Sequence, residues 1–313
     1  MDRFNRRTFI GMAGVGLLSG CTVPSVTRKG DPFEGGIGGT GIVGLLTEFG
    51  SLRVNGLRVE TTDRTVFQTP FEIVSEEAIR RGMALTIVAR RTGNGMEARN
   101  VQISWPVIGT VTGASGRFRV NGVPVRVEQG APGRMTPGVR VAVSGAWTPD
   151  GLVASRIDQA DQPDDVIAGV AERTGPTGLT VGGAPVRFSR GATPSAGSFV
   201  TVKGRMGAEG FEARTLAEGR FGDGAETLRQ LSIEGYLEPV DTAPGYRVAG
   251  LGHSFARNLR LAPLANRRAI YFGPYDGRFR ARAGYVLPEG VAARTDLLRG
   301  GFTKYEGPVV QTI

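Results

Sequence analysis

The sequence predicts an all-β fold of about four tandem small antiparallel β-barrel units, with a short helical insertion in the first unit. The 49 glycines and the small number of aromatic residues are typical of many short strands joined by tight turns. One pattern of strands and turns also recurs along the chain, and such a repeat indicates a single structural unit copied several times.

Each unit opens with an apolar strand that carries a glycine, in turn Gly44, Gly109, Gly169 and Gly235. A hairpin follows, and its turn pairs in the first three units are Asn55-Gly56, Asn121-Gly122 and Gly182-Gly183. These pairs accept positive φ at both central positions, as a type I′ turn requires. The corresponding stretch of the fourth unit, residues 246–251, is degraded.

The remaining strands of each unit also begin at glycines. The strand after the hairpin follows Gly82, Gly138 and Gly197, and the last strand begins at Gly95, Gly151 and Gly210. Apolar and polar residues alternate along these strands, so one face is buried and the other is exposed. Closing such a sheet removes its exposed edges, so we expect an OB-like barrel, with a twisted β-sandwich as the alternative. Residues 70–81, an insertion in the first unit, predict a short helix.

The N-terminal segment resembles the export signal of a bacterial lipoprotein. Arg6 and Arg7 precede an apolar run that is too short to span a bilayer as a helix, and this pattern is similar to a twin-arginine signal. The run ends in a sequence that resembles a lipobox: Leu18, Ser19, Gly20 and Cys21. This resemblance implies cleavage before Cys21 and attachment of lipid to its thiol, and several acyl chains anchor a protein stably.

The expected location is therefore the cell envelope, with the membrane as a partner through the lipid anchor. Thr22 stands where retention in the inner membrane usually requires an aspartate, so the outer membrane is favoured. Cys21 is the only cysteine, so intramolecular disulfides are excluded and the fold depends on hydrophobic burial.

Composition and repeat boundaries divide the chain into seven expected parts. They are a signal peptide at 1–20, a tether and glycine-rich lead-in at 21–41, β-barrel repeats at 42–106, 107–160 and 166–219, a divergent repeat at 231–288 and a C-terminal tail at 289–313.

The sequences GGIGGTG at residues 35–41 and FGSLRVNG at residues 49–56 are also the marks of a family. With them the chain resembles the bacterial DUF5666 family, whose β-strand units recur in tandem on exported lipoproteins. The resemblance covers residues 35–219 and implies a tandem β architecture and an envelope location. The family has no assigned activity, so the resemblance implies no catalytic residue.

The inventory of reactive side chains points away from an enzyme. His253 is the only histidine and Cys21 is taken by the lipid, so we predict no catalytic residue and no metal site. Residues 36–41 fit G-x-G-x-x-G, but a β pattern follows them instead of the helix that a dinucleotide needs, so no cofactor is expected. The aspartates of the linker between the second and third units lack the spacing of a calcium loop and predict a solvated linker: Asp158, Asp161, Asp164 and Asp165.

Arginine supplies nearly all of the positive charge in a chain of net charge +9. A solvated surface in an arginine-rich proteome accounts for this charge, and a patch that binds anionic partners is the alternative. The hairpins of units one to three carry Arg53, Arg58, Arg117, Arg119, Arg126 and Arg187. The fourth unit mixes arginines with aromatic residues, and its candidate ligand face is Tyr246, Arg257, Arg260, Tyr271, Tyr275, Arg278 and Arg280. The alternative is that these aromatic residues form the core of a divergent barrel.

These patterns favour a non-enzymatic binding or scaffold module that contacts a protein or a glycan of the envelope. An enzyme that acts on envelope polysaccharide through carboxylates is one alternative, since carboxylates that meet only in space are not visible in a sequence. A binder of an anionic polymer through the fourth unit is the other. Nucleic acid is disfavoured, because units one to three offer few exposed aromatic residues for base stacking.

Overall fold

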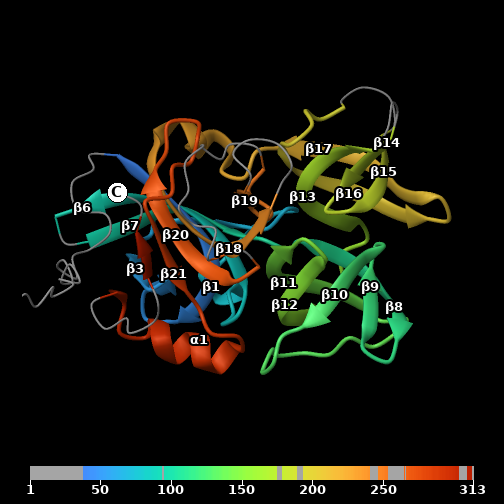
Figure 1. Ribbon diagram of the computed structural model, residues 1–313, viewed down its shortest axis with the longest axis horizontal. Helices are drawn as coiled ribbons and strands as arrows, with labels where there is room; N and C mark the ends of the chain where they lie inside the picture. Colours follow the sequence, from blue (N-terminus) through green and yellow to red (C-terminus); the bar gives the residue numbers. More distant parts are fainter. Residues whose placement is uncertain are drawn as a thin grey trace, which may run out of the picture.

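A computed structural model describes the protein over residues 38–93, 95–174, 178–188, 193–239, 246–252, 264, 266–302 and 309–311. Over these residues the chain is all-β, as predicted, and its strands form two sheets (Figure 1). The export signal with Arg6, Arg7, the lipobox and Cys21 lies outside the described residues, as do His253, Arg257 and Arg260.

The strands of each of the first three units pair into a closed ring of five. The first ring is β1 (Gly39–Glu48), β2 (Leu52–Val54), β3 (Leu57–Glu60), β7 (Gly95–Ile103) and β6 (Ala84–Thr92). The second is β8 (Val107–Ala114), β9 (Arg117–Val120), β10 (Val123–Val127), β12 (Gly151–Gln159) and β11 (Arg140–Thr148). The third is β13 (Asp165–Thr174), β14 (Gly178–Val181), β15 (Ala184–Phe188), β17 (Gly210–Glu218) and β16 (Phe199–Gly207).

We had predicted antiparallel barrels, and this is wrong for one strand pair of each ring. In each ring the third and the last strand run parallel: β3 with β7, β10 with β12, and β15 with β17. This follows from the order of the strands, because the fourth strand pairs back to the first and leaves the third beside the last. The fourth strand also carries a bulge in every ring, which bends it and helps the sheet to close.

The fourth unit has a different arrangement. Its strands are β18 (Leu228–Pro239), β19 (Tyr246–Val248), β20 (Arg268–Pro274), β21 (Ala283–Val286) and β22 (Val309–Gln311). Among the described residues they form no ring, and β18 instead pairs parallel with β1 of the first unit. A fourth barrel therefore stays a prediction.

The insertion in the first unit contains the predicted short helix as a single 3₁₀ turn, η1 (Glu76–Ala78). Ile79 follows it and is buried in the core of the first ring. Two short strands, β4 (Val66–Gln68) and β5 (Ile73–Val74), precede the turn and extend the sheet beside β7. A second 3₁₀ segment, η2 (Gly222–Thr227), connects the third unit to β18, and α1 (Val291–Leu298) follows β21.

The four units associate as two pairs. β1 joins the first unit to the fourth, and β8 pairs antiparallel with β13 to join the second unit to the third. Figure 1 shows the second and third rings side by side in green and yellow. The blue and orange strands of the first and fourth units pack together to their left.

The repeated glycine and the hairpin asparagine depend on each other. Asn121 has φ 50° at the hairpin turn and Gly122 has φ 79°, as predicted for a type I′ turn. The side-chain amide of Asn121 donates to the carbonyl of Ile108 on β8 at 2.7 Å and to that of Val166 on β13 at 3.1 Å. A Cβ on Gly109 would overlap the Asn121 side chain, so the glycine makes room for this bridge.

The first unit repeats this arrangement with different partners. Gly44 faces Asn55, whose amide nitrogen donates to the carbonyl of Val43 on β1 at 3.0 Å and to that of Ser232 on β18 at 3.2 Å. In both pairs of units, then, the asparagine bonds the first strand of its own unit to the first strand of the neighbouring unit.

Replacing Gly109 with alanine is therefore expected to lower the free energy of unfolding by about 1–3 kcal/mol, because the added methyl group overpacks against Asn121. The control is Gly93→Ala, where a Cβ meets no atom within 4 Å. Urea unfolding followed by circular dichroism measures both. Equal stabilities of the two variants would show that Gly109 is not needed for the asparagine bridge.

Candidate functional site

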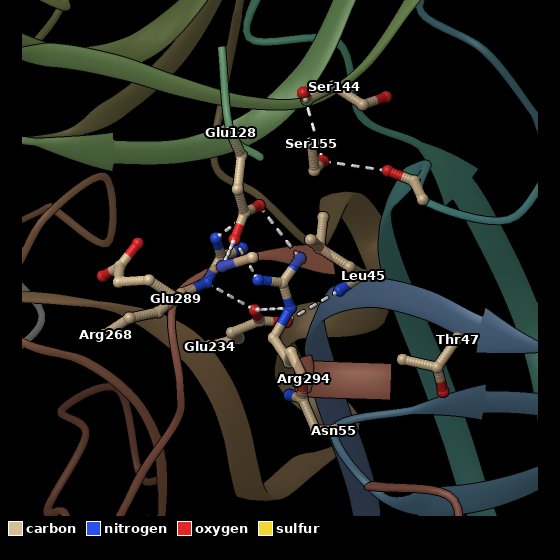
Figure 2. A network of polar contacts seen from close by, with 12 residues as sticks. Leu45, Thr47, Asn55, Glu128, Ser144, Ser155, Glu234, Arg268, Glu289 and Arg294 are labelled. Carbon is tan, nitrogen blue, oxygen red and sulfur yellow. Dashed lines mark hydrogen bonds and ion pairs between the residues drawn. The ribbon is translucent and has the colours of Figure 1, made fainter. Parts of the chain in front are cut away.

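Four buried charged residues meet where three of the units and α1 come together, and we call them the charge node. They are Glu128 after β10, Glu234 on β18, Arg268 on β20 and Arg294 on α1 (Figure 2). The side chains of all four are at most 2% exposed. Two positive and two negative charges balance, so the node is neutral as a whole.

Each carboxylate of the charge node contacts both arginines. Arg268 donates from Nε to Glu234 at 2.7 Å and from Nη1 to Glu128 at 3.0 Å. Arg294 makes a two-pronged contact with Glu128, and its Nε lies 3.4 Å from Glu234. Two-pronged arginine–carboxylate pairs fix direction as well as distance.

Backbone groups complete the charge node and extend it into neighbouring segments. Gly290 N, just before α1, donates to Glu128 Oε1 at 3.0 Å. Leu45 N on β1 donates to Glu234 Oε2 at 3.0 Å. The second unit, the first unit, the fourth unit and the C-terminal helix therefore all bond to one cluster.

The charges keep both kinds of group ionised in spite of their burial. Burial alone would raise the pKa of Glu128, but the hydrogen bond from Arg294 and the charges of Arg268 and Arg294 outweigh it and lower that pKa. Burial would lower the pKa of Arg268, and the charges of Glu234 and Glu128 raise it instead. Ionised and enclosed groups of this kind hold elements together, and they are not placed to exchange protons with a substrate.

Trp147 on β11 occupies the junction between the second, third and fourth units. Its indole Nε1 donates to the carbonyl of Ala168 at 2.9 Å, and its ring lies where a Cβ on Gly182 or Gly250 would overlap it. Ala168 precedes the repeated glycine of the third unit, as Ile108 does in the second. The tryptophan of the second unit thus supplies the donor for a position that an asparagine serves in the second unit, since the third unit has Gly182 at its hairpin turn.

A cavity of about 50 Å³ separates Trp147 from the charge node and is lined by Arg220, Glu234 and Arg268 among others. Arg268 Nη2 is buried and has no hydrogen-bond partner in the described part of the chain. Arg220 lies 3.8 Å from the ring centre of Phe199 and donates to the carbonyl of Gly250. Burial lowers the pKa of Arg220 to about 10, so it remains protonated at neutral pH.

With the rings and the junction described, the comparison with known families can be placed on the structure. Residues 108–158 match the model of a domain of unknown function, DUF5666. The matched segment runs from Ile108 on β8 to Asp158 on β12 and so covers the second ring. No curated protein and no solved structure matches the chain. The second ring is called the DUF5666 barrel below.

The described members of the fourth unit's candidate ligand face do not form one surface. Tyr271 was predicted there, but it is buried in the core of the fourth unit with Phe279 and Leu264, because it lies on the inner side of β20. Burial raises the pKa of its phenol. The side chain of Tyr246 on β19, like the whole of Arg257 and Arg260, is outside the described part of the chain.

The other predicted members of that face gather at the turn after β20. Tyr275 is half-buried, while Arg278 and Arg280 are exposed. Arg280 pairs with Asp276 at 2.5 Å, so part of the local positive charge is neutralised.

The aspartates between the second and third units pair with arginines and accept a backbone hydrogen bond. Asp165 pairs with Arg140 on β11 and accepts from the backbone of Met206 on β16 at 2.8 Å. Asp158 pairs with Arg156 at 2.6 Å, and Asp164 lies 3.3 Å from Arg214. Within the described residues, no group of three or more side chains of the kinds that bind metals converges. In the same part of the chain no helix has the length and apolar character needed to cross a bilayer.

Sequence reasoning did not find the charge node. A usable signal was present for two of its members, because Glu234 interrupts an apolar stretch of β18 and Arg268 begins the apolar strand β20. A charge at an inward strand position requires a buried partner. The partners themselves could not be identified from the sequence, since Glu128 and Arg294 are 166 residues apart and meet only in the folded chain.

Proposed function

We propose that this protein is a lipid-anchored, non-enzymatic component of the bacterial cell envelope that binds a protein or a glycan. The observation that carries the proposal is the charge node. In it, the buried carboxylates Glu128 and Glu234 hold several units and a helix in fixed positions. Barrels in fixed positions suit a binding scaffold.

The barrel type supports a binding role. We propose that each repeat is an OB-like unit and that the fourth is a divergent copy. In favour of this, the rings have five strands in the order first, second, third, fifth, fourth. OB barrels bind oligonucleotides or oligosaccharides on the face of their second and third strands and on neighbouring loops.

The location follows from the N-terminal segment. We propose export through the twin-arginine signal at Arg6 and Arg7, cleavage at the lipobox and anchoring through lipid on Cys21, with the outer membrane favoured. The twin-arginine route exports folded proteins. It suits this fold, because β1 pairs with β18, which is far along the sequence, and this pairing needs most of the chain to be present.

The alternative of a polysaccharide-active enzyme needs two carboxylates at a site that a sugar chain can reach. Glu128 and Glu234 converge, but both are enclosed and paired with arginines. Glu172 and Glu238 also converge, and both are paired with Arg247. This geometry favours the binding function over the enzyme.

The experiment that tests the binding function is chemical crosslinking in intact cells, followed by purification of the tagged protein and mass spectrometry of proteins and glycans. We expect one envelope component to be recovered in near-stoichiometric amount with the wild-type chain and to be lost with Cys21→Ser. Recovery of abundant envelope proteins alone, with no enriched glycan, would contradict the proposal.

A further inference from the structure

The DUF5666 barrel carries a cleft that differs from the equivalent surfaces of the other two rings. It has a volume of about 540 Å³, within the usual range of ligand sites. Its walls come from β9 and β10, from the loop before β9, from the loop between β11 and β12, and from Tyr236 and Asn266 of the fourth unit. We call it the arginine cleft.

Three arginines line this cleft. Arg117 and Arg119 are alternate residues of β9 and so share one face, and both are exposed. Val125 of β10 pairs with Phe118, and this register places Arg126 across from Arg117. Like charges opposite each other on neighbouring strands destabilise a sheet. The arrangement therefore costs the fold stability unless an anion binds.

None of these three arginines forms an ion pair with the described residues. Arg119 donates to the carbonyl of Gly122 at 2.6 Å, which is a neutral acceptor. The lining includes one carboxylate, Asp150 in the loop between β11 and β12. The cleft thus has an excess of positive charge.

The same surface is neutralised in the neighbouring rings. In the first ring Arg53, the counterpart of Arg119, lies 3.2 Å from Glu48, and Arg58 lies 2.7 Å from Glu60. In the third ring Arg187, the counterpart of Arg126, pairs with Glu209. The counterparts of Arg119 and Arg126 in the neighbouring rings thus have carboxylate partners, which the cleft arginines lack among the described residues.

From this contrast we infer that the arginine cleft binds the carboxylated sugars of an acidic polysaccharide. Guanidinium groups bind carboxylates through paired hydrogen bonds. Thr148, Asp150 and Asn266 in the lining offer groups that match sugar hydroxyls, and Phe118 offers one half-buried ring. Base stacking along a nucleic acid requires several exposed aromatic rings, which this lining does not have. The inference rests on the proposed binding function and names its ligand class.

The test measures binding of trigalacturonate and polygalacturonate to the purified full-length chain by isothermal titration calorimetry. The test variant combines Arg117→Gln, Arg119→Gln and Arg126→Gln. The control variant combines Arg58→Gln, Arg187→Gln and Arg214→Gln, which removes the same charge from exposed positions elsewhere. A short sugar is included because it fills one cleft and does not bridge several patches.

We expect the wild type and the control variant to bind both sugars with similar affinity. The test variant should lose roughly tenfold in affinity for each arginine removed. The control variant should keep the thermal unfolding midpoint of the wild type. The test variant should unfold at the same or a higher temperature, because the repulsion between the facing arginines is removed. If the test variant unfolds, the single changes Arg117→Gln and Arg126→Gln replace it, each with an expected loss of roughly tenfold.

Equal losses in the test and control variants would overturn the inference, because they would indicate unspecific charge attraction. So would a wild type that fails to bind trigalacturonate, or that binds a single-stranded thymidine oligonucleotide or phosphatidylglycerol vesicles more tightly than polygalacturonate. If trigalacturonate fails while crosslinking in cells still recovers one partner, the cleft assignment is wrong and the binding function stands. If the chain binds the sugars but is found in the cytoplasm, the cleft assignment stands and the proposed envelope function is wrong.

Discussion

Replacing Glu128 with alanine is expected to lower the free energy of unfolding by about 3–5 kcal/mol, because it leaves two buried arginines without their shared carboxylate. Arg268 would keep Glu234, whereas Arg294 would lose its two-pronged partner and retain only the 3.4 Å contact with Glu234. The backbone N–H of Gly290 would lose its acceptor as well. An uncompensated positive charge would then remain in the core.

The matched control is Glu60→Ala, which breaks the exposed pair with Arg58. Exposed pairs of this kind contribute about 0–1 kcal/mol, so this variant should unfold at nearly the wild-type urea concentration. Urea unfolding of wild type and both variants provides the measurement. A Glu128→Ala variant no less stable than Glu60→Ala would show that the charge node does not hold the units together.

The lowered pKa of Glu128 also sets the pH dependence. Because its pKa is lower in the folded than in the unfolded chain, its stabilising effect is present above the unfolded value of about 4.3. The effect is lost as the pH falls from there through the folded-state pKa. Glu128→Gln should therefore have a weaker dependence of stability on pH below about 4.3 than the wild type. Parallel curves for the two proteins would contradict this role.

Trp147→Ala is the second change with a large expected effect, a loss of about 3–5 kcal/mol. The indole fills the space between the glycines of two hairpins, and its removal leaves a cavity where three units meet. The carbonyl of Ala168 would also lose its donor. The effect should be largest on the attachment of the third and fourth units to the DUF5666 barrel.

The two tryptophans of the chain allow the hydrogen bond to be separated from the ring. Both are buried, at 8% exposed for Trp147 and 7% for Trp105. Among the described residues Trp105 Nε1 has no partner, whereas Trp147 Nε1 donates to Ala168. Trp147→Phe should therefore cost about 1–3 kcal/mol more than Trp105→Phe. Chemical denaturation of both variants measures the difference, and equal losses would mean that the bond to Ala168 contributes nothing.

The regular part of the fold could be predicted because it is encoded locally. Glycines at fixed places precede or start the fourth and last strands of each ring, Asn-Gly and Gly-Gly pairs form the hairpins, and alternating residues mark the buried face. The closing of the rings through parallel strands was missed, since it depends on strand order and not on any single segment. The helix α1 was missed as well, because it has no side-chain cap and carries few apolar residues in a stripe.

The candidate sites were less predictable, for two physical reasons. The charge node depends on residues far apart in the chain, and a sequence shows an inward charge without its partner. Tyr271 was misplaced for the second reason: an aromatic residue close to arginines in the sequence can face either the core or the solvent, and the structure buries it. The arginine cleft was visible as arginines in hairpins, but only the structure shows which of them have carboxylate partners.

The anchored location, on which the proposed function depends, is tested most directly by metabolic labelling with an alkyne-bearing fatty acid followed by cell fractionation. We predict a labelled wild-type chain in the membrane fraction. Cys21→Ser should be unlabelled and absent from the membrane, and a variant with Arg6→Lys and Arg7→Lys should remain in the cytoplasm. An unlabelled wild-type chain in the soluble fraction would contradict a lipid-anchored binding protein of the envelope.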